Sequence, residues 1–98
     1  MTTPPELAAL RATIDNVDAQ IVALLAQRFA ATDQVGRLKA ASGLQAVDEA
    51  RERQQQQRFS ELAARHGLDD AVVQRLFRLV IDEVVGRHRR TAQQQAVR

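Results

Sequence analysis

The sequence contains no cysteine, tryptophan or tyrosine, and it has only three phenylalanines and two prolines among its 98 residues. The lack of cysteine excludes disulfide bridges and zinc sites built on thiolates, and it is compatible with a reducing compartment. Because 45% of the residues are hydrophobic but few are aromatic, the core must consist mainly of Leu, Val, Ile and Ala side chains. The length indicates one small domain, for which self-association is a reasonable expectation.

The sequence also lacks any apolar run near the roughly 20 residues that a membrane-spanning helix needs. Its first residues do not combine a basic stretch with an apolar one, so we read no signal peptide and expect a soluble, cytoplasmic protein. The net charge is only +2, from 14 basic and 12 acidic residues, which provides no strong field for nucleic acid. Arg87, Arg89 and Arg90 are explained as cations near the C-terminus of a helix. We therefore expect neither a membrane nor a nucleic-acid partner.

The apolar residues predict three helices and no strand, so the fold class is all-α. The first helix covers 6–41 and the second 48–65, while the third opens at Asp69 or Asp70. Between the first two, residues 42–45 form a breaker that includes a glycine. The apolar positions of the first helix alternate spacings of three and four, as in the seam of a coiled coil. This seam comprises Leu7, Leu10, Ile14, Val17, Ile21, Leu24, Arg28, Ala31, Val35 and Leu38.

We expect the domain to cover 6–90, with a short tail at 1–5 and a frayed tail at 91–98. At ~1.5 Å per residue the first helix would be roughly 50 Å long. A compact domain of this size is only about 35 Å across, so two shorter helices of the same chain cannot cover the seam. We expect a second copy to cover it, in an intertwined homodimer with two-fold symmetry.

One position of this seam holds an arginine, Arg28. A buried guanidinium without a partner costs several kcal/mol, so it must either meet an anion or reach solvent along its aliphatic stem. The pattern leaves open whether that anion belongs to the protein or to a ligand. Arg11 flanks the seam about 25 Å away along the helix axis. The two arginines could therefore share a small ligand only across an antiparallel contact between two chains.

Other charged residues also allow two interpretations. Lys39 projects from nearly the same face as Arg28, and it is either a ligand-binding cation or a lysine stabilised at its helix end. Asp48, Arg51 and Glu52 form either an N-cap with an exposed ion pair or a cluster that binds a carboxylate and a hydroxyl. The histidine on the apolar stripe of the third helix, His88, is more often structural than functional.

Five segments in order carry a family likeness: AALR at 8–11, LLAQR at 24–28, VGRLK at 35–39, DEARER at 48–53 and RLFRLVIDEV at 75–84. With these, the chain resembles the all-helical chorismate mutases, in particular the mutase domain of the bifunctional chorismate mutase–prephenate dehydratases of enteric bacteria. The resemblance extends from about Leu7 to His88 without a gap. It implies a three-helix protomer in an intertwined homodimer, here a stand-alone isomerase. Its reaction would be the rearrangement of chorismate to prephenate in aromatic amino acid biosynthesis, without cofactor or metal.

The resemblance also implies roles for the cations. Arg11 would reach from the partner subunit to bind one substrate carboxylate, and Arg28 would bind the other. Lys39 would hydrogen-bond the ether oxygen and a carboxylate, and Arg51 would line the site.

The remaining positions follow in the same way. Asp48 and Glu52 would hold the ring hydroxyl, and the apolar neighbours that exclude water would be Val35, Ile81 and Val84. Two positions depart from the family pattern. Val84 stands where enteric members commonly have a hydroxyl residue, and His88 stands where Gln or Glu usually faces the ether oxygen. A neutral imidazole donates one N–H and an imidazolium donates two, so the resemblance leaves the pH dependence of this contact open.

Two alternatives to a mutase are considered. Isochorismate pyruvate lyase, which leads to salicylate, shares the fold and a similar arginine and lysine set, although the ungapped likeness favours the mutase. A non-catalytic helical dimer that binds nucleic acid through 87–90 would not explain Arg28 in the seam. Docking to another enzyme of the aromatic pathway is left open by the sequence.

Overall fold

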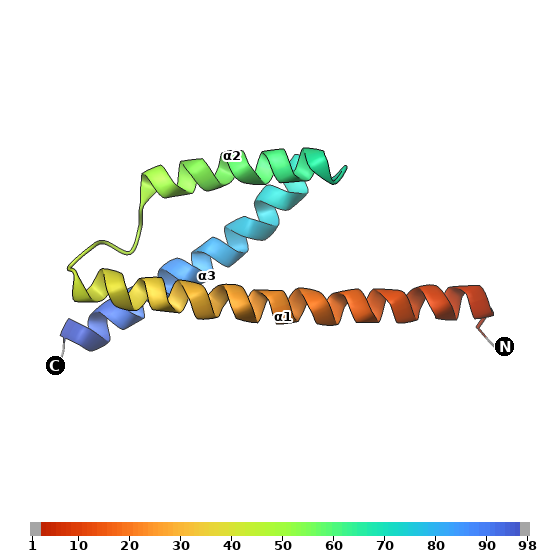
Figure 1. Cartoon of the computed structure of the whole chain (residues 1–98), viewed down its shortest axis with the longest axis horizontal. Coiled ribbons are helices and arrows are strands. Elements are labelled where there is room, and N and C mark those ends of the chain that lie inside the picture. Colours follow the sequence, from red (N-terminus) through yellow and green to blue (C-terminus); the bar gives the residue numbers. More distant parts are fainter. Residues whose placement is uncertain (1–2, 97–98) are drawn as a thin grey trace. The chain divides into compact units, whose positions relative to one another are not determined.

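The computed structural model describes residues 3–96 and contains three α-helices joined by short loops (Figure 1). Helix α1 is Pro5–Ala41, α2 is Glu49–Arg65 and α3 is Asp70–Ala96. The predicted all-α class and the long first helix are confirmed, and no strand occurs among the described residues. By its internal contacts the chain divides into two parts, Met1–Ala31 and Thr32–Arg98. The first holds most of α1, and the second holds the end of α1 with α2 and α3.

Two glycines end α1 and α2 in the same way. Gly43 has a φ of 69°, its N–H bonds to the carbonyl of Ala40, and the next N–H, of Leu44, bonds to the carbonyl of Lys39 at 2.8 Å. Gly67, with a φ of 67°, ends α2 by the same pair of bonds. A side chain would be strained at this φ, so glycine determines where each helix stops.

Acidic residues begin α2 and α3, as the sequence predicts. The Oδ1 atom of Asp48 accepts a hydrogen bond from the backbone N–H of Arg51 at 3.0 Å, so the predicted N-cap is confirmed. Asp69 accepts in the same way from the N–H of Ala71 at 2.9 Å. Helix α1 begins one residue earlier than predicted, at Pro5. Proline is suited to this position because the N–H groups of a first turn have no partner within the helix.

The end of α3 differs from the prediction. The structure has helix as far as Ala96 in place of the frayed tail expected from Thr91, while residues 97 and 98 lie outside the described residues. Ala and Gln, which are good helix formers, make up most of 91–96. Extending an existing helix costs far less than starting one, so α3 continues beyond its apolar stripe.

Helices α2 and α3 pack against each other and form the core of the second part. The buried apolar side chains are Phe59 and Ala63 of α2 with Val80 and Ile81 of α3. The rings of Phe59 and Phe77 stack at a centroid distance of 3.9 Å. The core is thus aliphatic, as predicted, with a single aromatic pair added.

In the first part, the apolar seam of α1 is exposed. Its exposed side chains are Leu7, Leu10, Ile14, Val17, Ile21 and Leu24. Leu10 and Leu24, for example, retain 63% and 62% of their accessible surface. None of the helices described is long and apolar enough to cross a membrane.

Candidate functional site

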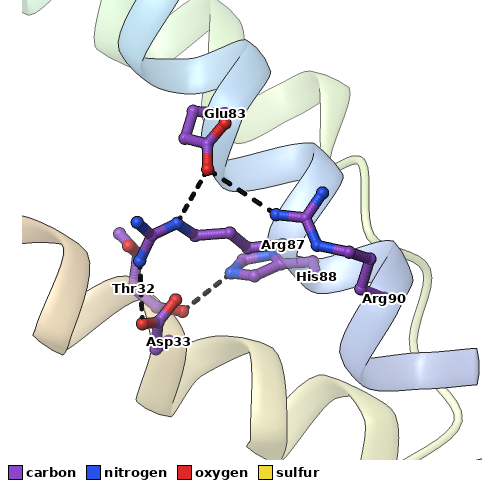
Figure 2. A network of polar contacts seen from close by, with 6 residues as sticks. All are labelled: Thr32, Asp33, Glu83, Arg87, His88 and Arg90. Atoms are coloured by element: carbon purple, nitrogen blue, oxygen red, sulfur yellow. Dashed lines mark hydrogen bonds and ion pairs between the residues drawn. The ribbon is translucent and has the colours of Figure 1, made fainter. Parts of the chain in front are cut away.

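Helix α3 brings His88 against the last turns of α1. The side chain is only 5% exposed, and its Nε2 atom lies 2.7 Å from the carbonyl oxygen of Thr32 (Figure 2). A carbonyl oxygen can only accept, so Nε2 carries the proton and donates it. The other ring nitrogen, Nδ1, is also buried and has no hydrogen-bond partner among residues 3–96. His88 is therefore a buried histidine in which Nε2 donates to Thr32 and Nδ1 has no hydrogen-bond partner among the described residues.

Gly36 provides the space for this ring. It is the buried residue of α1, and a Cβ atom built on it would lie 2.5 Å from Cδ2 of His88. Carbon atoms do not approach so closely, so any other residue here would displace the ring or the helix. Gly36 lies inside the helix predicted over 6–41, where we expected no contact for it. A glycine inside a helical pattern usually has a packing reason, and that signal could have indicated a close contact here without naming its partner.

Arg87, next to His88 in the chain, forms a second link to α1. Its Nη1 donates to Asp33 Oδ2 at 3.0 Å and its Nε donates to Glu83 Oε1 at 3.0 Å (Figure 2). The hydrogen bond to Glu83, aided by the negative charge of Asp33, raises the pKa of Arg87 above its ordinary value despite some desolvation. Sequence reasoning treated Arg87 as a cation at a helix end, and it missed this network.

Lys39 is half-buried and is bound to the loop after α1. Its Nζ donates to the carbonyl oxygen of Ala46 at 3.2 Å, while its own carbonyl accepts the N–H of Leu44. An ammonium group has three N–H donors, so one bond does not exhaust its capacity. Lys39 also lies one helical turn beyond Gly36, on which His88 packs.

Asp48 and Arg51 both lie exposed at the start of α2. Asp48 uses one carboxylate oxygen for the cap, and the guanidinium of Arg51 donates to Gln54 at 3.0 Å. Arg51 also borders an open hollow of about 590 Å³ on the surface of α2. The N-cap interpretation of Asp48 is thus confirmed, and it leaves the second carboxylate oxygen for other contacts.

Glu52 lies in a narrow cleft between α2 and α3. The cleft, of about 30 Å³, is lined by Glu52, Ile81 and Arg78 together with surrounding side chains of both helices. Arg78 Nη2 lies 3.6 Å from Glu52 Oε1, and Arg78 Nε donates to Asp82 at 3.1 Å. Two predicted site residues, Glu52 and Ile81, therefore share a cleft, and sequence reasoning missed the arginine beside them.

The structure gives only local positions for the other predicted residues. Arg11, which is exposed, and Arg28, which is half-buried, belong to the part Met1–Ala31. Val35 is exposed on α1, and Val84 is half-buried on α3.

Comparisons with known proteins identify the family of this chain. The family model described as chorismate mutase type II matches residues 10–89. A bifunctional chorismate mutase/prephenate dehydratase from Escherichia coli (strain K12) is 38% identical over 85 residues, which cover 87% of this chain and 22% of that protein. The protein of the same description from Shigella flexneri gives the same values. The chain thus spans about a fifth of the length of the curated relatives it matches. Since the family match covers most of a chain that folds into three helices, the chain belongs to the type II chorismate mutase family.

Proposed function

We propose that the protein converts chorismate to prephenate. Membership of the type II chorismate mutase family, through residues 10–89, carries this proposal. The reaction is an intramolecular rearrangement in which a C–O bond breaks while a C–C bond forms, so it requires no nucleophile and no proton transfer. A protein accelerates it by holding the substrate in its compact conformer and by matching the charge that develops on the ether oxygen.

The active form in this proposal is an intertwined homodimer. The exposed seam of α1 supports it, because a stripe of six large apolar side chains from Leu7 to Leu24 is unfavourable in water and fits a second copy. Arg11 and Arg28 support it as well, because their separation along one helix prevents them from gripping the same small molecule. Each site would then combine Arg11 of the partner chain with Arg28, so that each arginine binds one carboxylate of the substrate.

Lys39 and His88 would face the ether oxygen. This oxygen gains negative charge in the transition state, so donors directed at it act more strongly there than in the ground state. The Nζ of Lys39, which has one bond to the loop, retains donors for this contact. The bond to Thr32 leaves only Nδ1 of His88 for such a role.

The remaining residues would orient and enclose the substrate. Asp48 and Glu52 would accept hydrogen bonds from the ring hydroxyl, and Arg51 would line the site. The apolar enclosure would consist of Val35, Ile81 and Val84. Excluding water in this way strengthens the electrostatic contacts.

The test is a direct assay of chorismate consumption by the purified chain, with prephenate identified as the product. Chorismate turnover to prephenate is expected, and failure to turn it over at any protein concentration would contradict the proposal. Isochorismate is offered in parallel, because formation of salicylate and pyruvate would identify the protein as a lyase instead.

A further inference from the structure

Two consecutive residues of α3 bind two consecutive residues of α1. His88 donates to the carbonyl of Thr32 at 2.7 Å, and Arg87 donates to the carboxylate of Asp33 at 3.0 Å (Figure 2). Gly36 lies close to the ring of His88, as a Cβ atom on it would meet three ring atoms. The imidazole is therefore confined by a hydrogen bond and by contact with α1, and the ion pair joins the same turns of the two helices.

The proton distribution on this ring follows from its partners. In the neutral ring only one nitrogen carries a proton, and the bond to Thr32 assigns that proton to Nε2. Neutral His88 therefore presents an acceptor at Nδ1. An ether oxygen also only accepts, so the neutral ring has nothing to donate to it. A hydrogen bond from His88 to such an oxygen requires a second proton, on Nδ1.

We propose that Asp33 and Arg87 are positioning residues for His88. The Thr32 carbonyl holds the proton on Nε2, and the Arg87–Asp33 pair fixes α3 to α1 beside that bond, so that His88 donates to the substrate only as an imidazolium, through Nδ1. This inference rests on the proposed mutase function for its kinetic consequence, whereas the proton assignment on the free protein does not depend on that function.

The charged side chains next to this contact come from both helices. On α1 they are Asp33 and, one turn beyond Gly36, Lys39; on α3 they are Glu83, Arg87 and Arg90. Arg87 binds both carboxylates, and Arg90 Nη2 adds a longer contact of 3.6 Å to Glu83. The negative charge of Asp33, adjacent to Thr32, is thus compensated by Arg87. Removing Arg87 leaves the carboxylate of Asp33 uncompensated, whereas removing Asp33 leaves Arg87 paired with Glu83.

The two partner variants should therefore act in opposite directions. Arg87→Gln leaves the carboxylate of Asp33 to favour the imidazolium, so the uptake of a proton by His88 should move to higher pH. Asp33→Asn removes a carboxylate that favours the imidazolium while Arg87 stays paired with Glu83, so the uptake should move to lower pH. Arg87→Lys, which keeps the charge, should restore most of the wild-type behaviour.

The experiment is nitrogen NMR of the whole chain with ¹⁵N-labelled histidine, followed across pH 5 to 9. The chain has two histidines, and exposed His66, at the end of α2, serves as an internal reference in each spectrum. His88→Gln assigns the signals. We expect Nε2 of His88 to keep its proton at high pH, Nδ1 to gain one on acidification, and kcat to increase with it. Arg90→Gln is the matched control, since it removes a cation of the same cluster that has only a 3.6 Å contact to Glu83 and does not touch Asp33, and it should affect His88 less than Arg87→Gln does.

Several outcomes would overturn the proposal. A proton on Nδ1 instead of Nε2 at high pH would contradict the hydrogen bond from His88 to the Thr32 carbonyl. If His88 took up its proton at the same pH in the wild type, in Arg87→Gln and in Asp33→Asn, the positioning role of Asp33 and Arg87 would be contradicted. If kcat did not follow the protonation of His88, the imidazolium would not be the hydrogen-bond donor to the substrate. An inactive wild-type protein with the expected spectra would contradict the mutase function alone, because the proton assignment would stand.

Discussion

Gly36 of α1 and His88 of α3 are in such close contact that a methyl group on the glycine would lie 2.5 Å from Cδ2 of the ring. This contact makes the ring position dependent on the absence of a side chain in a helix. Ordinarily, replacing an exposed helical glycine by alanine stabilises a helix by about 1 kcal/mol. Here the gain is opposed by the cost of displacing a buried ring, about 1–3 kcal/mol for an overpacked site.

We predict that Gly36→Ala lowers both the melting temperature and kcat. Gly86→Ala on α3 is the control, because its added Cβ would only approach the flexible end of Arg90 at 3.4 Å. Thermal unfolding by circular dichroism and the prephenate assay measure the two effects. A Gly36→Ala protein as stable and active as wild type would show that the ring has room to move.

Lys39→Ala should reduce kcat by about 10²-fold or more, since it removes the cation proposed to face the oxygen that gains charge. The lost bond to the Ala46 carbonyl should cost only about 1 kcal/mol of stability, so the helical fold should persist. Arg37→Ala removes an exposed cation from the same stretch of α1 and should retain activity. Near-normal turnover by the Lys39 variant would exclude it from the mechanism.

His88→Gln should flatten the dependence of kcat on pH. The donor proposed for the wild type is the imidazolium, which needs a second proton on Nδ1 and loses it in alkaline solution. Activity should therefore decrease toward alkaline pH in the wild type. An amide N–H does not titrate, so the variant should donate equally across the range. If both proteins gave the same profile, another group would be responsible for it.

Arg78→Gln should raise the KM for chorismate several-fold with little change in melting temperature. The pair that Arg78 forms with Glu52 is partly exposed, so its contribution to stability is about 0–1 kcal/mol. The effect should therefore appear in the orientation of the Glu52 carboxylate. Asp82→Asn, which removes the other partner of Arg78, should leave KM near wild type. If the wild type, Arg78→Gln and Asp82→Asn had similar KM values, Arg78 would have no role in binding the substrate.

Mixing two inactive variants tests the shared site. Arg11→Ala and Arg28→Ala should each abolish most activity. After the two are unfolded together and refolded, random pairing places half the chains in mixed dimers with one intact site each. About a quarter of wild-type activity should then return. If Arg11 and Arg28 of one chain served the same site, the mixture would remain inactive.

Local features of this chain could be predicted from the sequence because they depend on neighbouring residues. The Asp48 cap and the glycine at 43 concern single helix ends, and the long helix follows from its own periodicity. The contact of Gly36 with His88 and the pairing of Arg78 with Glu52 depend on which turns of different helices face each other. A single sequence contains no direct signal for that register. The role of Gly36 therefore became clear only once α3 was in place.

The exposed seam of α1 has a consequence for how the protein folds. Helices in water derive most of their stability from packing, and the segment before residue 31 has its apolar stripe exposed in the single chain. If association covers that stripe, forming the helix and pairing the chains become one equilibrium. The midpoint of unfolding should then rise with protein concentration, as mass action requires of a folded state that contains two chains. Diluting the protein should therefore be enough to unfold the first part of α1.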